Sequence, residues 1–344
     1  MAKRFGIRNI AEITGYSVAT VSRVLNKKGK YSEDAEAAIL EVARKYNYHP
    51  DVQAKGLKSS ATRYIGILIP DISIHFYFSL AQMIQIELIG KNYYPFYLNV
   101  GPKGLTLDKG MDILLSLKVA GIICISSQID NSYLEQLNIP VVYVNRFFTE
   151  MDKLQTNVKR SSVSMDYRQG SALAAKELFD NGCKKVAFIT TKHQGMSEQA
   201  NQLKEKSFQE VAELLGMEYV HCVDEDVIEG ISAASYRIAK TLFETHPDVD
   251  GIYCGSDYCA VGVATYLLEQ GIDIPGRVQV ISFGQTSGLD FSVKAFSAIV
   301  LPEKLLAKEA TALIIDLVEK EDMPVKEVLI PVSFSRGATT KSKS

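Results

Sequence analysis

The feature that most restricts the fold of this chain is the run of residues 10–26, in which two helical patterns flank a glycine turn. The first pattern is apolar at Ile10 and Ile13, the turn contains Gly15, and the second pattern begins directly after Ser17. A serine there is suited to cap a helix, because its hydroxyl accepts a hydrogen bond from an unpaired N–H group of the first turn. Helix, glycine turn and helix make up the helix-turn-helix motif, whose second helix lies in a DNA major groove. The run therefore predicts a DNA-binding head.

A third helix follows a basic loop and completes the predicted head, residues 1–49. Ser32 is its expected N-cap, and the acidic residues that follow lie in the first turn, where the helix dipole favours negative charge. Its apolar stripe consists of Ala35, Ile39, Val42, Ala43 and Tyr46. The helix must end before Pro50, because the residue before a proline is driven away from the helical conformation. The head is thus expected to be an all-α domain with a minimal core.

Residues 50–62 are predicted to form a hinge. Val52, Ala54 and Leu57 give a weak helical pattern, and Gly56 costs it about 1 kcal/mol relative to alanine. A segment this short and polar is marginal alone and folds only when something holds it.

The head and the rest of the chain differ in the sign of their net charge. Residues 1–63 carry twelve Lys/Arg and six Asp/Glu, a difference of +6, whereas the remaining residues carry 26 and 34, a difference of −8. A basic head suits phosphate neutralisation, and an acidic body discourages the rest of the chain from lying on DNA. An ordinary solvated surface explains the same numbers, so charge alone does not decide.

Composition restricts the compartment, the membrane segments and the metal sites that the chain can have. The five cysteines contain no C-x-x-C pair and lie mostly in apolar runs, so we expect buried reduced thiols in a cytosolic compartment. No apolar run reaches the roughly 20 residues that span a bilayer, and the N-terminus lacks a signal-peptide core. The five histidines show no metal-ligand spacing. The sequence therefore predicts a soluble cytoplasmic protein without metal or cofactor.

From residue 64 onward, apolar strands alternate with helical patterns. The first series of predicted strands is 64–69, 95–100, 120–125 and 141–144. The second series is 163–165, 186–190, 219–223, 251–254 and 278–283. Continuous apolar strands separated by helices indicate parallel sheets covered on both faces, and two such series indicate two doubly wound lobes. Ligands of such sheets bind beyond the carboxyl ends of the strands, so we expect a site in the cleft between the lobes.

Over essentially its full length the chain resembles the lactose-repressor family of bacterial transcription regulators. The residues that carry the resemblance are 17–26, 48–50, 54–57, 65–71, 139–142 with Arg146, and 254–257. The body, residues 63–344, is similar to periplasmic sugar-binding proteins, which implies two parallel-sheet lobes joined by three crossings. The crossings are expected near Ser162, Lys294 and Lys326. Lobe 1 would then comprise about 63–162 and 295–325, and lobe 2 about 163–294 and 326–340.

The resemblance implies that the second helix of the head reads the major groove. Val18 and Ala19 would occupy its base-facing start, where small apolar side chains contact thymine methyl groups. Arg23, one turn on, would contact a guanine or a phosphate. The phosphate contacts are expected from Ser17, Thr20, Ser22 and Asn26. For Thr20 and Ser22, helix capping or simple exposure is the alternative.

The resemblance also implies that two hinges pair in the minor groove of the operator. An apolar wedge, Leu57, would unstack a base step there, and Lys55 and Lys58 would meet phosphates. A flexible linker with an incidental leucine is the alternative for this segment.

In the body the resemblance implies a small-molecule effector, most simply a sugar or sugar derivative. Its expected contacts are Phe76, Tyr77, Arg146, Asp166, Lys204, Asp257 and Gln285. Carboxylates and guanidinium groups suit polyols, because each pairs with two neighbouring hydroxyls. The alternatives are a helix N-cap for Asp257, with the helix beginning at Tyr258, and an inter-lobe salt bridge for Arg146. Lys204 stands where the family often has arginine and cannot form a planar fork, so the identity of the effector is open.

The implied function is that of a transcriptional regulator, expected to be a repressor, that binds a near-palindromic operator as a homodimer. Residues 336–344 are small, polar and basic, so they are expected to fray and to form no tetramer contact. An enzyme is the first rival, but the dinucleotide, P-loop and nucleophile-elbow motifs are missing. A solute-binding protein is the second, and it leaves the basic head unexplained.

Overall fold

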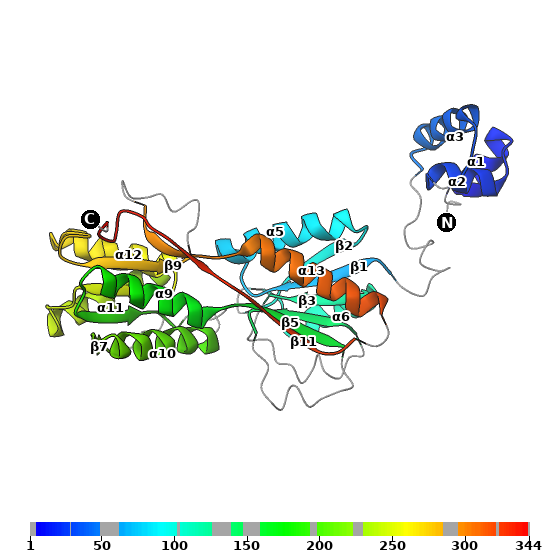
Figure 1. Cartoon of the computed structure of the whole chain (residues 1–344). Helices are drawn as coiled ribbons and strands as arrows, with labels where there is room; N and C mark the ends of the chain where they lie inside the picture. The colour runs from blue at the N-terminus through cyan, green and yellow to red at the C-terminus, as the bar shows by residue number, and fades with distance from the viewer. Residues whose placement is uncertain are drawn as a thin grey trace. The chain divides into compact units, whose positions relative to one another are not determined.

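The computed structural model describes residues 5–27, 29–48, 62–101, 104–125, 139–146, 159–192, 198–222, 230–284, 295–320 and 323–342. The chain divides into two compact units: residues 1–62, which include the predicted head, and residues 63–344, the body (Figure 1). Within the described ranges, no helix has the length and apolar character that crossing a membrane requires.

The head contains three helices: α1 (Ile7–Thr14), α2 (Val18–Leu25) and α3 (Glu33–Lys45). Ser17 caps α2, as predicted, because its Oγ accepts a hydrogen bond from the N–H of Thr20 at 3.1 Å. Ser32 caps α3 in the same way and accepts from the N–H of Ala35 at 3.3 Å. Each cap pairs one of the N–H groups that the first turn of a helix leaves open.

A small apolar core holds the three helices together. It consists of Ile10, Val21, Val24, Ala35, Ile39 and Ala43. Gly15 ends α1 with a φ of 74°, a conformation that costs other residues about 1–2 kcal/mol. Its N–H donates to the carbonyl of Ala11 at 2.9 Å, which closes the helix and fixes the turn into α2. The glycine is therefore required by the turn geometry of the motif.

The first lobe of the body is a six-stranded, wholly parallel sheet with strand order β11-β5-β4-β3-β1-β2. Its strands are β1 (Tyr64–Ile69), β2 (Tyr94–Asn99), β3 (Gly121–Cys124), β4 (Val141–Val144), β5 (Arg160–Met165) and β11 (Lys326–Ile330). Helices α5 (His75–Gly90) and α13 (Glu303–Glu319) cover one face, and α6 (Leu107–Ser116) covers the other. α13 packs closely on β3 at Gly121. A Cβ at this position would lie only 2.7 Å from Cδ1 of Ile314, so glycine permits the close approach.

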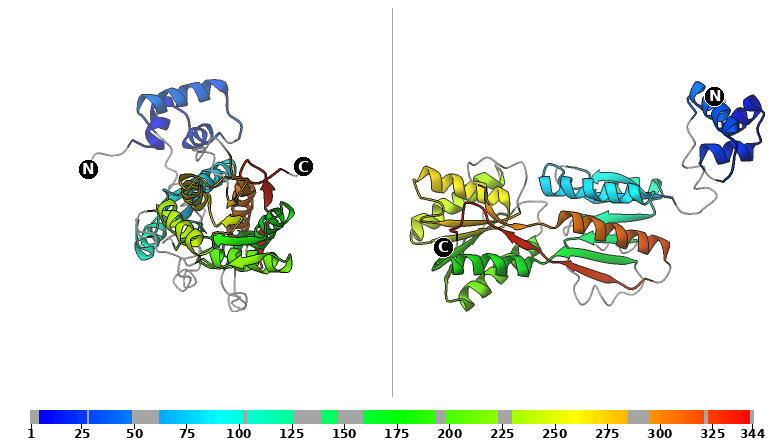
Figure 2. Two further views of the ribbon diagram at one scale, coloured as in Figure 1. Left: turned by 90° about the vertical axis from the view of Figure 1, so that its left-hand side faces the viewer. Right: turned by 45° about the horizontal axis from the view of Figure 1, so that its top comes forward.

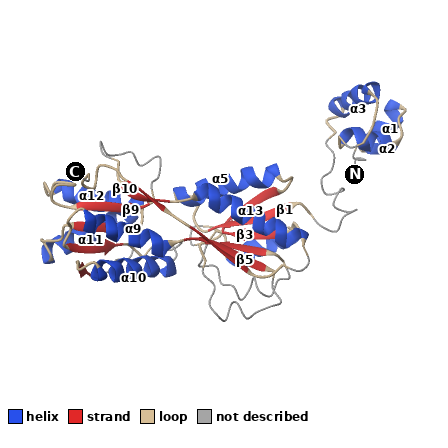
Figure 3. Ribbon diagram, viewed as in Figure 1, coloured by secondary structure: helices blue, strands red, loops and turns tan. Residues whose placement is uncertain are grey.

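The second lobe is built in the same way around a sheet of order β12-β10-β9-β8-β6-β7. Its strands are β6 (Lys185–Ile189), β7 (Glu218–Val220), β8 (Gly251–Cys254), β9 (Gln279–Phe283), β10 (Ser297–Val300) and β12 (Ser333–Ser335). β12 alone is antiparallel to its neighbour. Helices α9 (Tyr167–Asp180) and α10 (Glu198–Leu214) cover one face, and α11 (Ile231–Thr245) and α12 (Asp257–Glu269) cover the other (Figure 3). The expected class, a helical head with two doubly wound lobes, is confirmed.

The chain passes between the two sheets three times, but at later positions than expected (Figure 2). The passages follow the ends of β5, β10 and β11, namely Met165, Val300 and Ile330. The expected positions were Ser162, Lys294 and Lys326. The whole of β5 and β11 therefore belongs to the first sheet and β10 to the second, which moves the lobe boundaries drawn from the sequence.

The shift has a physical cause in the composition of these strands. β5 and β10 contain buried serines in place of apolar side chains: Ser161, Ser162, Ser164 and Ser297. A small hydroxyl is tolerated inside when it finds a partner, as Ser164 does by donating to the carbonyl of Arg146 at 3.0 Å. Hydrophobic patterning therefore recognises only the last part of β5 and misses β10.

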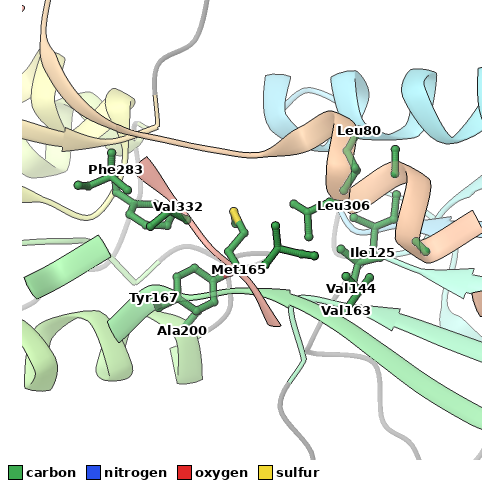
Figure 4. Packing of buried hydrophobic residues seen from close by; sticks show 14 of the residues in the cluster. Leu80, Ile125, Val144, Val163, Met165, Tyr167, Ala200, Phe283, Leu306 and Val332 are labelled. Carbon is green, nitrogen blue, oxygen red and sulfur yellow. The ribbon is translucent and has the colours of Figure 1, made fainter. Parts of the chain in front are cut away.

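One hydrophobic core continues through both lobes and surrounds the passages. Figure 4 shows Met165 at the end of β5, with Leu306 of α13 towards the first lobe and Phe283 of β9 towards the second. Val332, between β11 and β12, lies in the same cluster. The lobes are therefore joined by packed side chains as well as by three stretches of backbone.

The segment after β12 is held by hydrogen bonds through Lys341, whose N–H donates to Oε1 of Gln279 at 2.9 Å. The Oγ1 of Thr339 donates to the carbonyl of Val280 at 2.7 Å and accepts from the N–H of Ser297 at 2.8 Å. Thr340 is also buried and shares a hydrogen bond with the Ser297 hydroxyl. The expectation that residues 336–344 fray is wrong for the described part, because these polar side chains pair with buried backbone.

The five cysteines are buried free thiols, as predicted. Burial raises the pKa of Cys183 to about 12 and also raises the pKa of Cys254 and Cys259. Thiols of this kind are unreactive near neutral pH.

Candidate functional site

One face of α2 carries the residues predicted to contact DNA. Positions 18, 19, 22, 23 and 26 share this face, because residues three or four apart are neighbours on a helix. Val18, Ala19 and Arg23 are exposed on it. Two small side chains at the start of the helix permit close approach to base edges, and Arg23 supplies a long side chain with several donors. The face has the shape and chemistry that reading a major groove requires.

The polar residues of this face also hold the helix together. Ser17 Oγ lies 3.0 Å from Thr20 Oγ1, in addition to its capping bond. Asn26 Nδ2 donates to the carbonyl of Ser22 at 2.7 Å and to its Oγ at 3.2 Å. The alternative of a local structural role is thus present for Thr20 and Ser22, and their phosphate contacts stay predictions. Lys55, Leu57 and Lys58 of the hinge lie outside the described residues.

The body contains a pocket where the two lobes meet. It encloses about 900 Å³, including space open to solvent. Its lining comes from the first lobe (Ile74, Phe76, Tyr77, Ile125, Val144, Asn145, Leu301 and Glu303) and from the second lobe with the first passage (Met165, Tyr167, Ala200, Asn201, Lys204, Ile231, Gly255, Ser256, Asp257, Tyr258, Phe283 and Gly284). The pocket lies beyond the carboxyl ends of strands in both sheets, where such folds bind ligands. Phe76, Tyr77, Lys204 and Asp257, four of the predicted effector residues, therefore line one cavity.

Each lobe contributes a pair of aromatic rings to the pocket. Phe76 and Tyr77, at the start of α5, have ring centroids 5.5 Å apart. Tyr167 and Phe283 form the second pair, with centroids 5.4 Å apart. Burial raises the pKa of both tyrosines above the usual range, so both hydroxyls stay protonated. The rings offer flat apolar surfaces with two hydroxyl tips.

Lys204 places an ammonium group deep in the wall formed by the second lobe. Its side chain is only 3% exposed, and its Nζ donates to the carbonyl of Gly255 at 2.7 Å. The same Nζ lies 4.6 Å from the ring centroid of Phe283 and 5.8 Å from that of Tyr167. Among the described residues it forms no ion pair, and burial lowers its pKa to about 8. The ammonium retains donors that this wall does not use.

Two carboxylates enter the pocket from opposite lobes. Asp257 is the first residue of α12, and its Oδ1 accepts from the N–H of Tyr258 at 2.8 Å. The predicted alternative, an N-cap role for Asp257, is wrong because Ser256 caps this helix through the N–H of Cys259. Glu303 begins α13 and accepts a hydrogen bond from the hydroxyl of Ser79. Burial raises the pKa of Glu303, and the charge of Asp257 adds to the effect.

Arg146 and Asp166, also predicted as effector contacts, do not line this pocket. The guanidinium carbon of Arg146 lies 5.0 Å from the ring centroid of Tyr143. Asp166 caps α9 and accepts from the N–H of Gln169 at 2.9 Å. Their positions suit them to hold the pocket walls. Gln285 lies outside the described residues.

Sequence reasoning missed Asn201 and Glu303. Asn201 is 8% exposed, and its Oδ1 has no hydrogen-bond partner within the described chain. It precedes Lys204 by one helical turn, so the shared face of α10 was a usable signal. Glu303 was hidden because the segment after β10 follows a passage that the strand pattern misplaced.

Comparison with known proteins identifies both units. Residues 6–51 match the family described as bacterial regulatory proteins, lacI family, and residues 175–340 match the periplasmic binding protein-like domain. The ribose operon repressor of Halalkalibacterium halodurans is 31% identical over 97% of this chain and 97% of its own. Catabolite control protein A of Priestia megaterium is 26% identical over 97% of this chain and 99% of its own. These relatives are regulators of transcription, not enzymes.

Solved structures show the same fold. The lac repressor dimer bound to operator and the anti-inducer ONPF matches with a TM-score of 0.81 at 16% identity, over 99% of this chain and 100% of that one. A LacI-family regulator from Enterococcus faecium with bound ribose matches with a TM-score of 0.64 at 19% identity, over 80% and 98%. With a DNA-reading head, a two-lobed body and a full-length relative above 30% identity, this chain is a DNA-binding transcriptional regulator and belongs to the lacI family of bacterial regulatory proteins.

Proposed function

We propose that the protein is a repressor that binds a near-palindromic operator as a homodimer, and that a sugar or sugar derivative in the pocket of the body controls its operator affinity. The observation that carries the proposal is the pocket lined from both lobes, with four predicted effector residues in it. A ligand that touches both lobes favours one arrangement of them over another, which is the differential affinity that a switch requires.

The head supplies sequence recognition in this proposal. Val18 and Ala19 contact thymine methyl groups, and Arg23 forms a bidentate contact with guanine or holds a phosphate. Ser17, Thr20, Ser22 and Asn26 set the register through phosphates. Leu57 is the minor-groove wedge of the hinge, flanked by Lys55 and Lys58. Because its proposed target is DNA, we place the protein in the cytoplasm.

The effector class is supported by the relatives and by the pocket. One relative is a ribose operon repressor, and one solved regulator of this fold holds ribose. The carboxylates of Asp257 and Glu303 accept from hydroxyls, and the rings of Phe76 and Tyr77 suit the apolar face of a sugar. Arg146 and Asp166 act as positioning residues.

Homodimerisation is supported by an apolar stripe on α5. The stripe consists of Phe78, Ile86 and Ile89, all exposed. Large apolar side chains exposed on one face of a helix favour an interface, and a second copy of the chain covers them in the proposed dimer.

The proposal is tested by a gel shift with a palindromic fragment from upstream of the gene, titrated with ribose and other sugars. We expect a specific complex that excess random DNA does not compete away and that one sugar weakens or strengthens. A thermal shift with the same sugars measures pocket binding separately. Equal affinity for operator and random DNA would contradict the regulatory role, and a response to none of the sugars would contradict the effector class.

A further inference from the structure

One relative of this chain is named a ribose operon repressor, but the pocket is poorly suited to a bare pentose. Most of the exposed surface inside it is apolar, and nine of its twenty lining residues have side chains without a polar group: Ile74, Phe76, Ile125, Val144, Met165, Ala200, Ile231, Phe283 and Leu301. A pentose carries a polar oxygen on nearly every carbon, and each one that meets such a wall loses its hydrogen bonds to water. The walls therefore fit a ligand with an extended apolar surface in addition to its hydroxyls.

The aromatic pairs specify the shape of that surface. Phe76 with Tyr77 comes from the first lobe, and Tyr167 with Phe283 comes from the second. All four rings line the same pocket, and Tyr77 is near enough to raise the pKa of Tyr167, so the two pairs lie close together there. Rings supplied by both lobes favour a planar group against them, because stacked or edge-on rings attract one another beyond simple burial.

The polar atoms beside these rings specify the edge of the planar group. Asn201 Oδ1 is a buried acceptor without a donor in the described chain, and it calls for an N–H or O–H from the ligand. Lys204, one turn along α10, has N–H donors left after its bond to Gly255 and calls for an acceptor. A donor beside an acceptor on one planar edge is the pattern of an amide or a nucleobase.

The carboxylates call for a different group. Asp257 and Glu303 come from opposite lobes, and neither forms an ion pair with Lys204 in the described part of the chain. Both accept hydrogen bonds, and the vicinal hydroxyls of a ribose ring supply donors in pairs.

We propose that the effector is a ribonucleoside, with its base between the aromatic pairs, the base edge on Asn201 and Lys204, and the ribose hydroxyls on Asp257 and Glu303. This inference rests on the proposed effector role of the pocket and narrows its ligand class. Both lobes contact the ligand in this arrangement. Nucleoside binding therefore favours one arrangement of the two lobes over another, as the proposed switch requires.

The test is isothermal titration of the full-length protein with ribose, uridine and inosine. We expect the better nucleoside to bind about tenfold or more tightly than ribose, since a site built to pair polar edges rejects a ligand that lacks them. Asn201→Leu should lower nucleoside affinity about tenfold and leave ribose affinity unchanged within experimental error. Asn201→Asp, which keeps the acceptor, should retain nucleoside binding. Gln202→Leu changes the exposed neighbour on α10 and is the matched control.

The outcomes separate the two proposals. If ribose binds as tightly as either nucleoside, and Asp257→Asn abolishes that binding, the nucleoside inference is overturned and the sugar effector stands. An equal loss of ribose and nucleoside affinity in Asn201→Leu, with an unchanged melting temperature, also overturns it. If none of the three ligands binds while operator binding persists, the assignment of this pocket to such effectors fails as well.

Discussion

The buried ammonium of Lys204 lowers the stability of the folded protein and supplies hydrogen-bond donors to the pocket. Its ammonium is buried against two rings and bonded to one carbonyl, with no counter-charge in the described chain. Burial lowers its pKa to about 8 from an ordinary 10.5, so the folded protein binds this proton less tightly than the unfolded chain. Between these two values the unfolded state holds more protons, and the free energy of unfolding therefore rises with pH. Below pH 8 the full cost of a buried charge is present, on the order of 3 kcal/mol.

Replacing this lysine by an apolar side chain should make stability less dependent on pH. We expect the melting temperature of Lys204→Met to exceed that of the wild type by more at pH 7 than at pH 10. The reason is that only the wild type loses a buried charge as the pH rises. Calorimetry of both proteins across this range measures the difference, and Lys206→Met, on the same helix and exposed, is the control. A constant difference at every pH would contradict the cause given for the shift.

A substitution at Arg23 tests how much a single residue contributes to DNA recognition. Arg23→Ala should reduce operator affinity about tenfold or more and leave binding to random DNA nearly unchanged, because a base contact carries about 1–3 kcal/mol of discrimination. Arg44→Ala removes an exposed positive charge from α3 and should weaken both by a similar small factor. Gel shifts on the two DNAs, with circular dichroism to check folding, measure this. If the two variants behave alike, Arg23 contacts only phosphate.

At the scale of helices and strands, the sequence predicted most where local chemistry decides the structure. The caps at Ser17 and Ser32 and the turn at Gly15 were readable, because each depends on a few neighbouring residues. The strand of residues 141–144 was predicted with its true ends, since all its side chains are buried and apolar. β5 and β10 were partly or wholly missed, because buried serines satisfied by distant partners have no signature along the chain. Asn201 was missed although it lies one turn from Lys204 on the same helix, because a single buried amide does not alter the apolar pattern of α10.

The stripe on α5 carries a prediction at this scale. Ile86 is 67% exposed at its centre, and Ile86→Glu should dissociate the proposed dimer, because a carboxylate in an apolar interface loses its water without gaining a partner. Leu214 at the end of α10 is 85% exposed and lies outside the stripe, so Leu214→Glu should leave the dimer intact. Light scattering behind a sizing column gives the mass of each. Two monomeric variants, or two dimeric ones, would place the interface elsewhere.

At the scale of the whole molecule, two binding functions share one chain, and each must affect the other if the proposed switch exists. An effector that changes operator affinity by some factor has its own affinity changed by the same factor when operator is bound. We expect a factor of about 5–150, of either sign.

The two halves of this linkage can be measured independently. Operator titrations with and without saturating effector give one factor, and effector titrations of the free protein and the operator complex give the other. Asp257→Asn should weaken effector binding without changing operator affinity in the absence of effector. A factor near one on both sides would show that the pocket and the head are uncoupled.

The order in which strands enter the two sheets has a consequence for synthesis. The head has its complete core within residues 5–48, so it is ready to form soon after it leaves the ribosome. The first sheet waits for β11 at residues 326–330, and the second waits for β12 at residues 333–335. Translation thus delivers a finished DNA reader long before the sensor that governs it, and a nascent chain reaches its regulated form only after residue 335 has been made.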